Sequence, residues 1–363
     1  MIPVTKPYLP SREKLDRYID GIYERQWLTN DGPLVRELTR RLEEYLGVEN
    51  LLLVCNGTLA LQIAYRALGI SGQALPVEAI TTPFTFLATA SSLKWEGVEP
   101  VFVDIDAGTW CLDPALIEAA ITPHTRAIVP VHVFGNACEV EAIDEIGHRH
   151  GLKVVYDASH AFGVTYKGES LLKHGDAATL SFHATKLFHT IEGGAIFFKR
   201  KGDLERARQM INFGITGPET IEEIGINAKM NEFQAAMGLC VLDEIEENMA
   251  ARQVAWDLYM TAMGDRVVAQ RRAAFVTNNY AYVPVVLESE TQVSSLIAQL
   301  NTQGIMPRRY FSPSLDATQL YGPGECCVSQ DIAKRILCLP LYSGVPASAI
   351  VNVILDSFDG NSL

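Results

Sequence analysis

The chain has 363 residues, of which 48% are apolar and 20% are charged, a composition typical of a globular enzyme with one large and one smaller domain. Its net charge of -13 argues against nucleic acid or a membrane surface as a general partner. The seven cysteines are scattered without a CxxC pair, which argues against a disulfide framework and favours a reducing cytoplasm. Because no apolar run reaches membrane-spanning length and the first residues do not resemble a signal peptide, we expect a cytoplasmic protein.

Strand-like and helical patterns alternate along the first part of the chain. The apolar run at 51–54 predicts a strand, and a helix is expected after Asn56-Gly57-Thr58. Strands are then predicted at 101–104, 127–132 and 153–157, with helices at 113–120 and 140–150 between them. This β-α-β alternation predicts an α/β fold with a mostly parallel sheet between layers of helices.

The pattern changes after a long helix predicted from Met230 to Glu247, in which Phe233, Met237, Leu239 and Leu242 are the expected core positions. Beyond it, strands are predicted at 280–287 and 305–311, with a helix at 293–303 between them. We therefore expect a large α/β domain at 1–250 and a small α+β domain at 251–363.

The segment Ser181-Phe182-His183-Ala184-Thr185-Lys186 carries the first chemical signal. It places a lysine just after a short strand-like run, and Glu192-Gly193-Gly194 and another apolar strand follow. A lysine amine can form an imine with an aldehyde, and the Ser181 hydroxyl can hold a phosphate, which together suggest pyridoxal 5'-phosphate (PLP). Since a lysine at a strand end is more often structural or solvated, this hypothesis depends on the cofactor's other partners.

Three other features can supply those partners. Asp157 ends a strand at the edge that faces the ligand crevice in parallel sheets, where its carboxylate can keep a pyridine nitrogen protonated; a helix N-cap is the alternative. Gly57 and Thr58 open a helix whose free amides can bind phosphate. Phe84 or Phe86 could stack on the ring, although core packing is the default for phenylalanine.

Two other kinds of site are poorly supported. The spacing of His160, His183 and His189 matches no zinc signature, so we expect no metal. A dinucleotide site is equally disfavoured, because no GxGxxG follows the first strand and no Walker loop is present.

Several motifs along nearly the whole chain occur together in one known family. They are WLTNDGP at 27–33, NGT at 56–58, TF at 85–86, HVFG at 132–135, DASH at 157–160, SFHATK at 181–186, EGG at 192–194, GINAKMNEFQAA at 225–236 and LPL at 339–341. With these motifs the chain resembles the DegT/DnrJ/EryC1/StrS family of PLP-dependent nucleotide-sugar aminotransferases. The resemblance implies the fold type I architecture of the aspartate aminotransferase superfamily, in which the large domain contains a mostly parallel sheet of seven strands.

The resemblance also implies a role for each matching residue. Lys186 would form the Schiff base with PLP and later carry the proton, and Asp157 would pair with the pyridine nitrogen. His160, where the family often has Gln, would lie near the phenolic oxygen, and Phe86 would stack on the ring. The implied phosphate ligands are Gly57, Thr58 and Ser181, with Asn227 from a partner subunit. A homodimer with shared active sites follows.

The implied reaction moves the amino group of L-glutamate to a keto-sugar nucleotide and leaves 2-oxoglutarate. The segment 308–315 (RRYFSPSL) resembles the substrate-binding segment of members that aminate C4 of dTDP-4-keto-6-deoxyglucose for surface polysaccharides. Arg308 or Arg309 would meet the diphosphate, with a solvated pair as the alternative. Many relatives carry a His shortly after this proline, and Leu315 and Asp316 stand here instead. The other implied substrate contacts are Thr29, Asn30, Lys229 and Tyr310.

Three other functions are alternatives to this reaction. A 3-keto-sugar aminotransferase of the same family is the main alternative. A PLP-dependent sugar dehydratase is disfavoured, because family dehydratases replace the lysine, usually with His. A catalytically silent binding module is disfavoured because Lys186 and Asp157 are both present.

Overall fold

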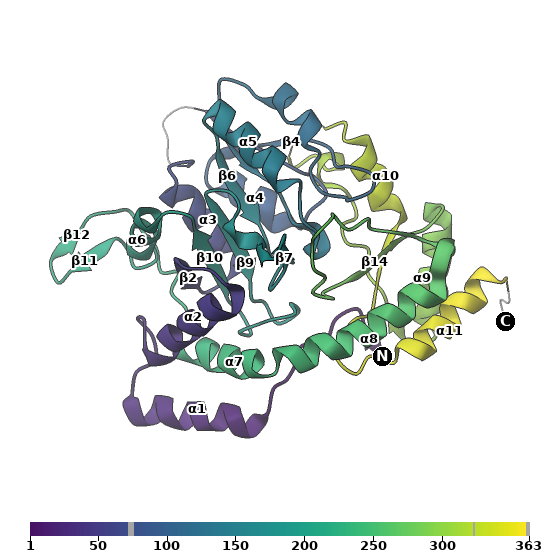
Figure 1. Ribbon diagram of the computed structural model, residues 1–363, viewed down its shortest axis with the longest axis horizontal. Coiled ribbons are helices and arrows are strands. Elements are labelled where there is room, and N and C mark those ends of the chain that lie inside the picture. The colour runs from purple at the N-terminus through teal and green to yellow at the C-terminus, as the bar shows by residue number, and fades with distance from the viewer. Residues whose placement is uncertain (72–75, 322–323, 361–363) are drawn as a thin grey trace.

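The computed structural model describes residues 1–71, 76–321 and 324–360 (Figure 1). A seven-stranded sheet forms its centre, in the order β2-β10-β9-β6-β5-β3-β4. Its strands are β2 (Leu51–Val54), β3 (Val77–Thr81), β4 (Val98–Phe102), β5 (Thr125–Val129), β6 (Lys153–Asp157), β9 (Ala177–Ser181) and β10 (Gly194–Phe198). Strand β10 runs antiparallel to both its neighbours, and the other pairings are parallel. The predicted α/β fold with a mostly parallel sheet is confirmed.

Helices cover both faces of this sheet, because alternate residues of each strand point to opposite sides. Leu51 and Leu53 of β2 belong to one apolar core, and Leu52 and Val54 belong to the other. The first core is closed by α2 (Pro33–Leu46), α5 (Val140–His150) and α7 (Glu232–Asp243). The second is closed by α3 (Gly57–Ala67), α4 (Leu87–Trp95) and α6 (Lys201–Met210).

Two predicted helices differ in the structure. The segment expected to be helical at 113–120 forms two 3-10 turns, Pro114–Leu116 and Glu118–Ala120. So short a segment gains little from helix propagation to offset its nucleation. The long helix predicted from Met230 to Glu247 is divided at Glu244 between α7 and α8 (Ile245–Met263).

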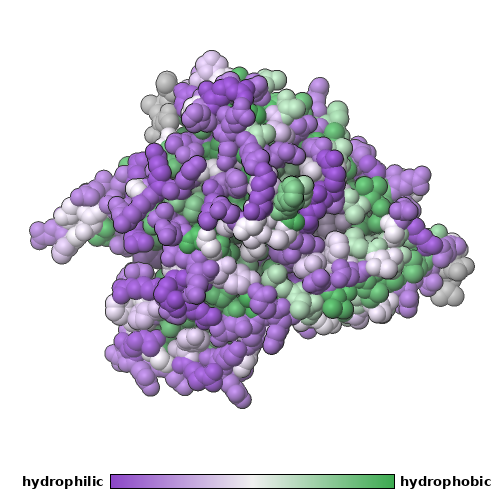
Figure 2. Space-filling model, in the orientation of Figure 1, coloured by the Kyte–Doolittle hydropathy of each residue, from purple (hydrophilic) through white to green (hydrophobic). Residues whose placement is uncertain are grey.

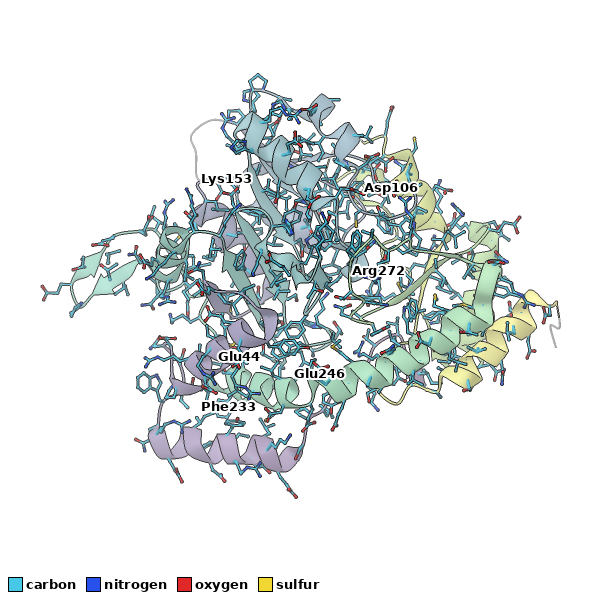
Figure 3. All side chains as sticks on the ribbon, viewed as in Figure 1. Glu44, Asp106, Lys153, Phe233, Glu246 and Arg272 are labelled. Carbon is cyan, nitrogen blue, oxygen red and sulfur yellow. The ribbon has the colours of Figure 1, made fainter. Side chains whose placement is uncertain are left out.

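The expected core positions on α7 are confirmed except for one. Met237, Leu239 and Leu242 are buried, whereas the Phe233 side chain is 39% exposed. Figure 3 labels Phe233 near the start of α7, on the side of α1 (Arg12–Arg25). The second residue of the helix thus lies outside the core that the following turns enter.

The C-terminal part contains a second, antiparallel sheet in the order β13-β14-β16. Its strands are β13 (Val268–Ala269), β14 (Val283–Val286) and β16 (Ile336–Leu339). Strands β14 and β16 share an apolar core with α8, α9 (Glu290–Thr302) and α11 (Ala347–Phe358), whereas both residues of β13 are exposed. Helix α8 runs from the large sheet into this part and crosses residue 250, where the domain boundary was predicted (Figure 1).

Short strands join distant parts of the chain. Strand β1 (Ile2–Pro3) pairs in parallel with β15 (Ile305–Met306), so the first residues lie with the C-terminal part. The two strands predicted at 280–287 and 305–311 are shortened to β14 and β15. Tyr280 has a φ of 51°, which ends extended geometry before β14. Arg308, Tyr310 and Phe311 line a cavity at the edge of the large sheet.

The remaining strands and one further helix are short. They are β7 (Thr165–Tyr166), β8 (Glu169–Ser170), β11 (Ile215–Gly217), β12 (Thr220–Ile221) and α10 (Cys327–Arg335). Strands β11 and β12 form a hairpin that projects from the body at the left of Figure 1. Among the helices of the three described ranges, none is long and apolar enough to cross a membrane.

Candidate active site

The segments that follow β2, β3, β6 and β9 meet around a cavity of about 310 Å³. All four strands end at the same edge of the sheet, because they run parallel to one another. The predicted site residues that line the cavity are Gly57, Thr58, Phe86, Asp157, His160, Ser181, Lys186, Arg308 and Tyr310. The fold therefore brings together most of the residues that the sequence proposed for cofactor binding.

Asp157 ends β6 at the base of this cavity and is only 4% exposed. Its carboxylate accepts hydrogen bonds from the Thr89 hydroxyl at 2.7 Å and from the Ser159 amide at 3.1 Å. Thr89 lies on α4 and is itself hydrogen-bonded to the Thr85 hydroxyl at 2.8 Å. Neutral donors thus fix the orientation of Asp157 and leave its charge available to a cationic group in the cavity.

Lys186 lies in the connection between β9 and β10, with its side chain against the cavity. Burial lowers the pKa of the Lys186 amine to about 8, although the negative charge of Asp157 acts in the opposite direction. Its Nζ donates a hydrogen bond to the Tyr282 hydroxyl at 3.3 Å. An appreciable fraction of this amine is therefore uncharged, and so nucleophilic, near neutral pH.

His160 is 7% exposed and lies in an aromatic environment. The Phe134 amide donates to its Nδ1 at 3.1 Å, which places the proton of the neutral ring on Nε2. Phe134 and Phe311 lie nearly parallel to the imidazole, at centroid distances of 5.9 and 5.8 Å. Burial, with a smaller effect of the Lys186 charge, lowers the pKa of His160 well below its usual value, so the ring is a neutral donor.

Gly57 and Ser181 lie close together in the lining of the cavity. Asn56 caps α3 by accepting the Leu59 amide at 2.8 Å, and the preceding amides of Gly57 and Thr58 have no acceptor within the helix. A Cβ placed on Gly57 would stand 2.8 Å from the Ser181 Cβ, so only glycine lets the helix approach the end of β9. The Gly194 Cβ would likewise stand 2.8 Å from the backbone of Asn56.

The two phenylalanines proposed for ring stacking have different positions. Phe84 is fully buried, with its ring edge-to-face against Phe134 and Phe311. Phe86 precedes α4, lines the cavity and is 53% exposed. Of the two, Phe86 is the residue with a free aromatic face for a ligand.

Five predicted contacts lie outside this cavity. Asn30 and Lys229 line a second cavity of about 790 Å³ between α2, β2 and α6, and Lys229 donates to Asn212 at 2.8 Å. Thr29 and Asn227 are exposed and do not line either cavity. The Arg309 guanidinium donates to the carbonyls of Ala333 and Lys334 near the end of α10, at 3.2 and 2.8 Å.

The reasoning from sequence missed two residues that contact the groups of the site: Tyr282, which lines the cavity, and Thr89, which lies behind Asp157. Tyr282 contacts Lys186 from a position 96 residues further along the chain, and Thr89 holds the Asp157 carboxylate across 68 residues. Tyrosine and threonine are common in such segments, and neither residue belongs to a motif with a chemical signature. No local sequence signal could have selected them.

The residues present fit PLP. A lysine amine with a lowered pKa, an acid held by neutral donors, a glycine-lined helix N-terminus beside a serine hydroxyl and an exposed phenylalanine all face one cavity. These are the groups that an aldehyde, a pyridine nitrogen, a phosphate and an aromatic ring require. The fold and the site together define a PLP-dependent enzyme of fold type I.

Comparison with known proteins gives the family. Residues 11–356 match the model of the DegT/DnrJ/EryC1/StrS aminotransferase family, and the chain belongs to that family. A dTDP-4-amino-4,6-dideoxy-D-glucose transaminase of Shigella dysenteriae is 41% identical over 97% of this chain and 96% of its own length. A protein of the same name from Escherichia coli is 37% identical over the same shares.

A solved structure agrees with this assignment. The structure of DesI in the presence of its TDP-sugar product covers 99% of this chain and 93% of that chain, with a TM-score of 0.92 and 33% identity. The predicted family, fold type and cofactor are thereby confirmed. The chain is an aminotransferase that uses PLP.

Proposed function

We propose that this enzyme moves the amino group of L-glutamate to C4 of dTDP-4-keto-6-deoxy-D-glucose, with 2-oxoglutarate as the second product. The observation that carries the proposal is the 41% identity, over 97% of the chain, to a transaminase named for the corresponding 4-amino sugar. The amino sugar would serve the synthesis of a surface polysaccharide.

The residues of the cavity have distinct tasks in this reaction. When bound, PLP supplies an electron sink for the negative charge that develops at the α-carbon of the amino donor. The Lys186 Nζ takes the α-proton, because an amine with a pKa of about 8 is partly uncharged at neutral pH. Asp157 would hold the pyridine N–H, and the His160 Nε2–H would donate to the phenolic oxygen.

Arg308 is our candidate for an anionic part of the substrate. It lines the cavity, and its guanidinium lies 5.1 Å from the centre of the Tyr310 ring. Arg309 is engaged by the carbonyls of α10 and by Glu290. Since the protein carries a net charge of -13, a placed cation is needed to bind a sugar diphosphate. We therefore assign the diphosphate to Arg308 rather than Arg309.

The active form that we propose is a homodimer with shared active sites. Large apolar side chains are exposed on and beside the β11–β12 hairpin, which projects from the surface in Figure 2; they are Phe213, Ile215, Ile221, Ile224 and Ile226. Ile221 and Ile224 are 72% and 81% exposed, a degree that favours a protein interface over solvent. The positions of Asn30, Asn227 and Lys229 outside the Lys186 cavity fit residues that act across such an interface.

The dimer proposal has a direct test. We expect the double variant Ile221→Asp, Ile224→Asp to sediment as a monomer and to lose turnover, because charges would be buried in the interface. Val254→Asp, at an apolar residue of α8 that is 71% exposed, is the matched control and keeps the wild-type mass. A monomeric wild-type protein with full activity would contradict the proposal.

We also place the enzyme in the cytoplasm. All seven cysteines are free thiols in the structure, and thiols persist in a reducing compartment. The nucleotide-sugar substrate is a metabolite of the same compartment.

The function is tested by product analysis. The holoenzyme is incubated with dTDP-4-keto-6-deoxyglucose and L-glutamate, and the sugar product is identified by NMR. We expect an amine at C4, and the coupling constants of H4 give its configuration. Amination at C3 of the corresponding 3-keto isomer, without reaction of the 4-keto sugar, would overturn the assignment.

A further inference from the structure

The hydroxyl of Tyr282 accepts a hydrogen bond from the Lys186 Nζ, the atom that would react with the cofactor. Its Oη lies 3.3 Å from the Lys186 Nζ, and the amine also lies 6.0 Å from the centre of the Tyr282 ring. Tyr282 immediately precedes β14, whereas Lys186 lies in the connection after β9. The contact therefore joins the two sheets of the molecule at the proposed catalytic amine.

Helix α8 fixes the backbone on both sides of this contact. The Asn248 amide group donates to the Leu187 carbonyl at 3.2 Å, and Arg252 donates to the Ala281 carbonyl at 3.4 Å. Arg252 also donates to the Asn248 side chain at 3.2 Å, one helical turn away. Asn248 and Arg252 are 1% and 2% exposed, so this support is enclosed by protein.

Aromatic neighbours fix the ring of Tyr282. The His160 imidazole lies 4.6 Å from it at 54°, and the Tyr310 ring stands edge-to-face at 6.1 Å. Phe134 contacts it at 5.4 Å. With backbone and ring both held, the hydroxyl has one well-defined position relative to the amine.

The hydroxyl of Tyr282 and the amine of Lys186 titrate in different pH ranges. Burial raises the pKa of the Tyr282 hydroxyl well above its usual value, whereas burial lowers that of Lys186 to about 8. The charged and titratable groups near the pair are Cys338, Asp157, His160, Arg252 and Tyr310. Tyr282 thus keeps its proton throughout the range in which the lysine titrates, accepting from the ammonium and donating to the free amine.

We propose that Tyr282 is a positioning residue for proton transfer. Its hydroxyl holds the free amine of Lys186 in place after the amine has taken the α-proton and until it returns that proton. Tyr282 exchanges no proton of its own: the α-carbon loses the proton to the lysine Nζ, and the same nitrogen gives it up again. The inference rests on the proposed amino transfer and deepens it, because it explains how the released lysine keeps its place.

The first test uses the apoprotein and does not depend on turnover. Acetylation of Lys186 by acetic anhydride is followed against pH by peptide mass spectrometry, which reports the titration of the amine. In Tyr282→Phe the ammonium loses an acceptor and the free amine loses a donor. Because the hydrogen bond from the charged ammonium is the stronger of the two, we expect the midpoint to fall by about 0.5 pH unit or more. Tyr280→Phe is the matched control, because the Tyr280 ring packs on Trp256 outside the cavity. Its midpoint should equal that of the wild type.

The second test uses the holoenzyme. In Tyr282→Phe we expect kcat to fall about tenfold or more while the KM for the keto-sugar nucleotide stays within about twofold, since proton transfer is affected and binding is not. Tyr282→Gln, which keeps a neutral hydrogen-bonding group, should recover part of the rate, and a loss of packing alone would give no recovery. An unchanged titration midpoint or an unchanged kcat in Tyr282→Phe overturns the proposal. Because the apoprotein titration uses no sugar, an error in the assigned sugar would leave its result intact.

Discussion

At the scale of single residues, the surroundings of Lys186 and Asp157 decide their chemistry. Lysine is fully charged at neutral pH in water, and burial alone makes this amine a usable base. Asp157 receives hydrogen bonds from Thr89 and Ser159 rather than from a guanidinium. Its negative charge is therefore not neutralised before a ligand arrives, which is the condition for pairing with a pyridine nitrogen.

The first prediction concerns Lys186 itself. Lys186→Ala should abolish both turnover and the visible absorbance of cofactor joined to the protein, because no other amine lines the cavity within the described residues. Assays with several amino donors measure the loss of turnover, and spectra of the purified variant with added PLP measure the loss of absorbance. Full activity of this variant with any donor would exclude the proposed chemistry.

The second prediction separates cofactor binding from catalysis. Asp157→Asn keeps one oxygen to accept the Ser159 amide, and its NH2 can donate to the Thr89 hydroxyl. PLP should therefore still bind, but transamination should fall about 100-fold or more because the electron sink is weakened. Thr89→Val removes one hydrogen bond to the carboxylate and should cost less, about tenfold. Equilibrium titration with PLP and single-turnover kinetics distinguish the two effects, and a wild-type rate in Asp157→Asn would contradict the assigned role.

At the scale of elements, the segment after β15 gives two adjacent arginines opposite tasks. Arg308 faces the cavity, and Arg309 faces the C-terminal end of α10, where it meets unpaired carbonyls and the negative end of the helix dipole. In extended backbone, neighbouring side chains point to opposite sides. This alternation explains why both arginines cannot reach the same ligand.

This division yields the third prediction. Arg308→Ala should raise the KM for the keto-sugar nucleotide about tenfold or more and leave the thermal unfolding midpoint unchanged. Arg309→Ala should lower the free energy of unfolding by about 1–3 kcal/mol, because helix carbonyls lose a charged donor, with little change in KM. Steady-state kinetics of both variants measure the change in KM, and thermal denaturation measures the change in stability. Reversed effects would show that Arg309, not Arg308, serves the substrate.

At the scale of the whole molecule, buried histidines set its response to acid. His132 is fully buried and stacks on Tyr156 at 4.7 Å, and its Nδ1 accepts the Cys138 amide at 3.2 Å. Burial, with the nearby His174 as a smaller cause, lowers the pKa of His132 to about 3. Asp144 acts in the opposite direction without offsetting this.

The fourth prediction follows from the sign of that shift. Below about pH 6.5 the unfolded chain binds a proton at this histidine and the folded protein does not, so stability falls as the pH falls. The expected loss is about 1.4 kcal/mol per pH unit from His132 between pH 6 and pH 4. Denaturant titrations at several pH values measure it. His132→Gln should flatten the slope, and the exposed His148→Gln should leave it unchanged.

Much of the architecture could be read from periodicity, and the exceptions have physical causes. The strands at 51–54 and 153–157 and the helix at 140–150 lie where predicted, because apolar pattern and burial agree there. The segment at 113–120 and the exposed Phe233 did not follow the pattern. The segment is too short for helix propagation to offset nucleation, and Phe233, the second residue of α7, precedes the turns that enter the core.

The sequence alone indicated the family and singled out Gly57, Asp157 and Lys186, which line one cavity, because these residues lie in local motifs at the ends of strands. The tertiary structure decided that Phe86 rather than Phe84 has a free face and that Arg308 rather than Arg309 reaches the cavity. It also brought Tyr282 to Lys186 across 96 residues. Periodicity records which face of an element is buried, whereas a contact between two sheets depends on how the whole chain closes.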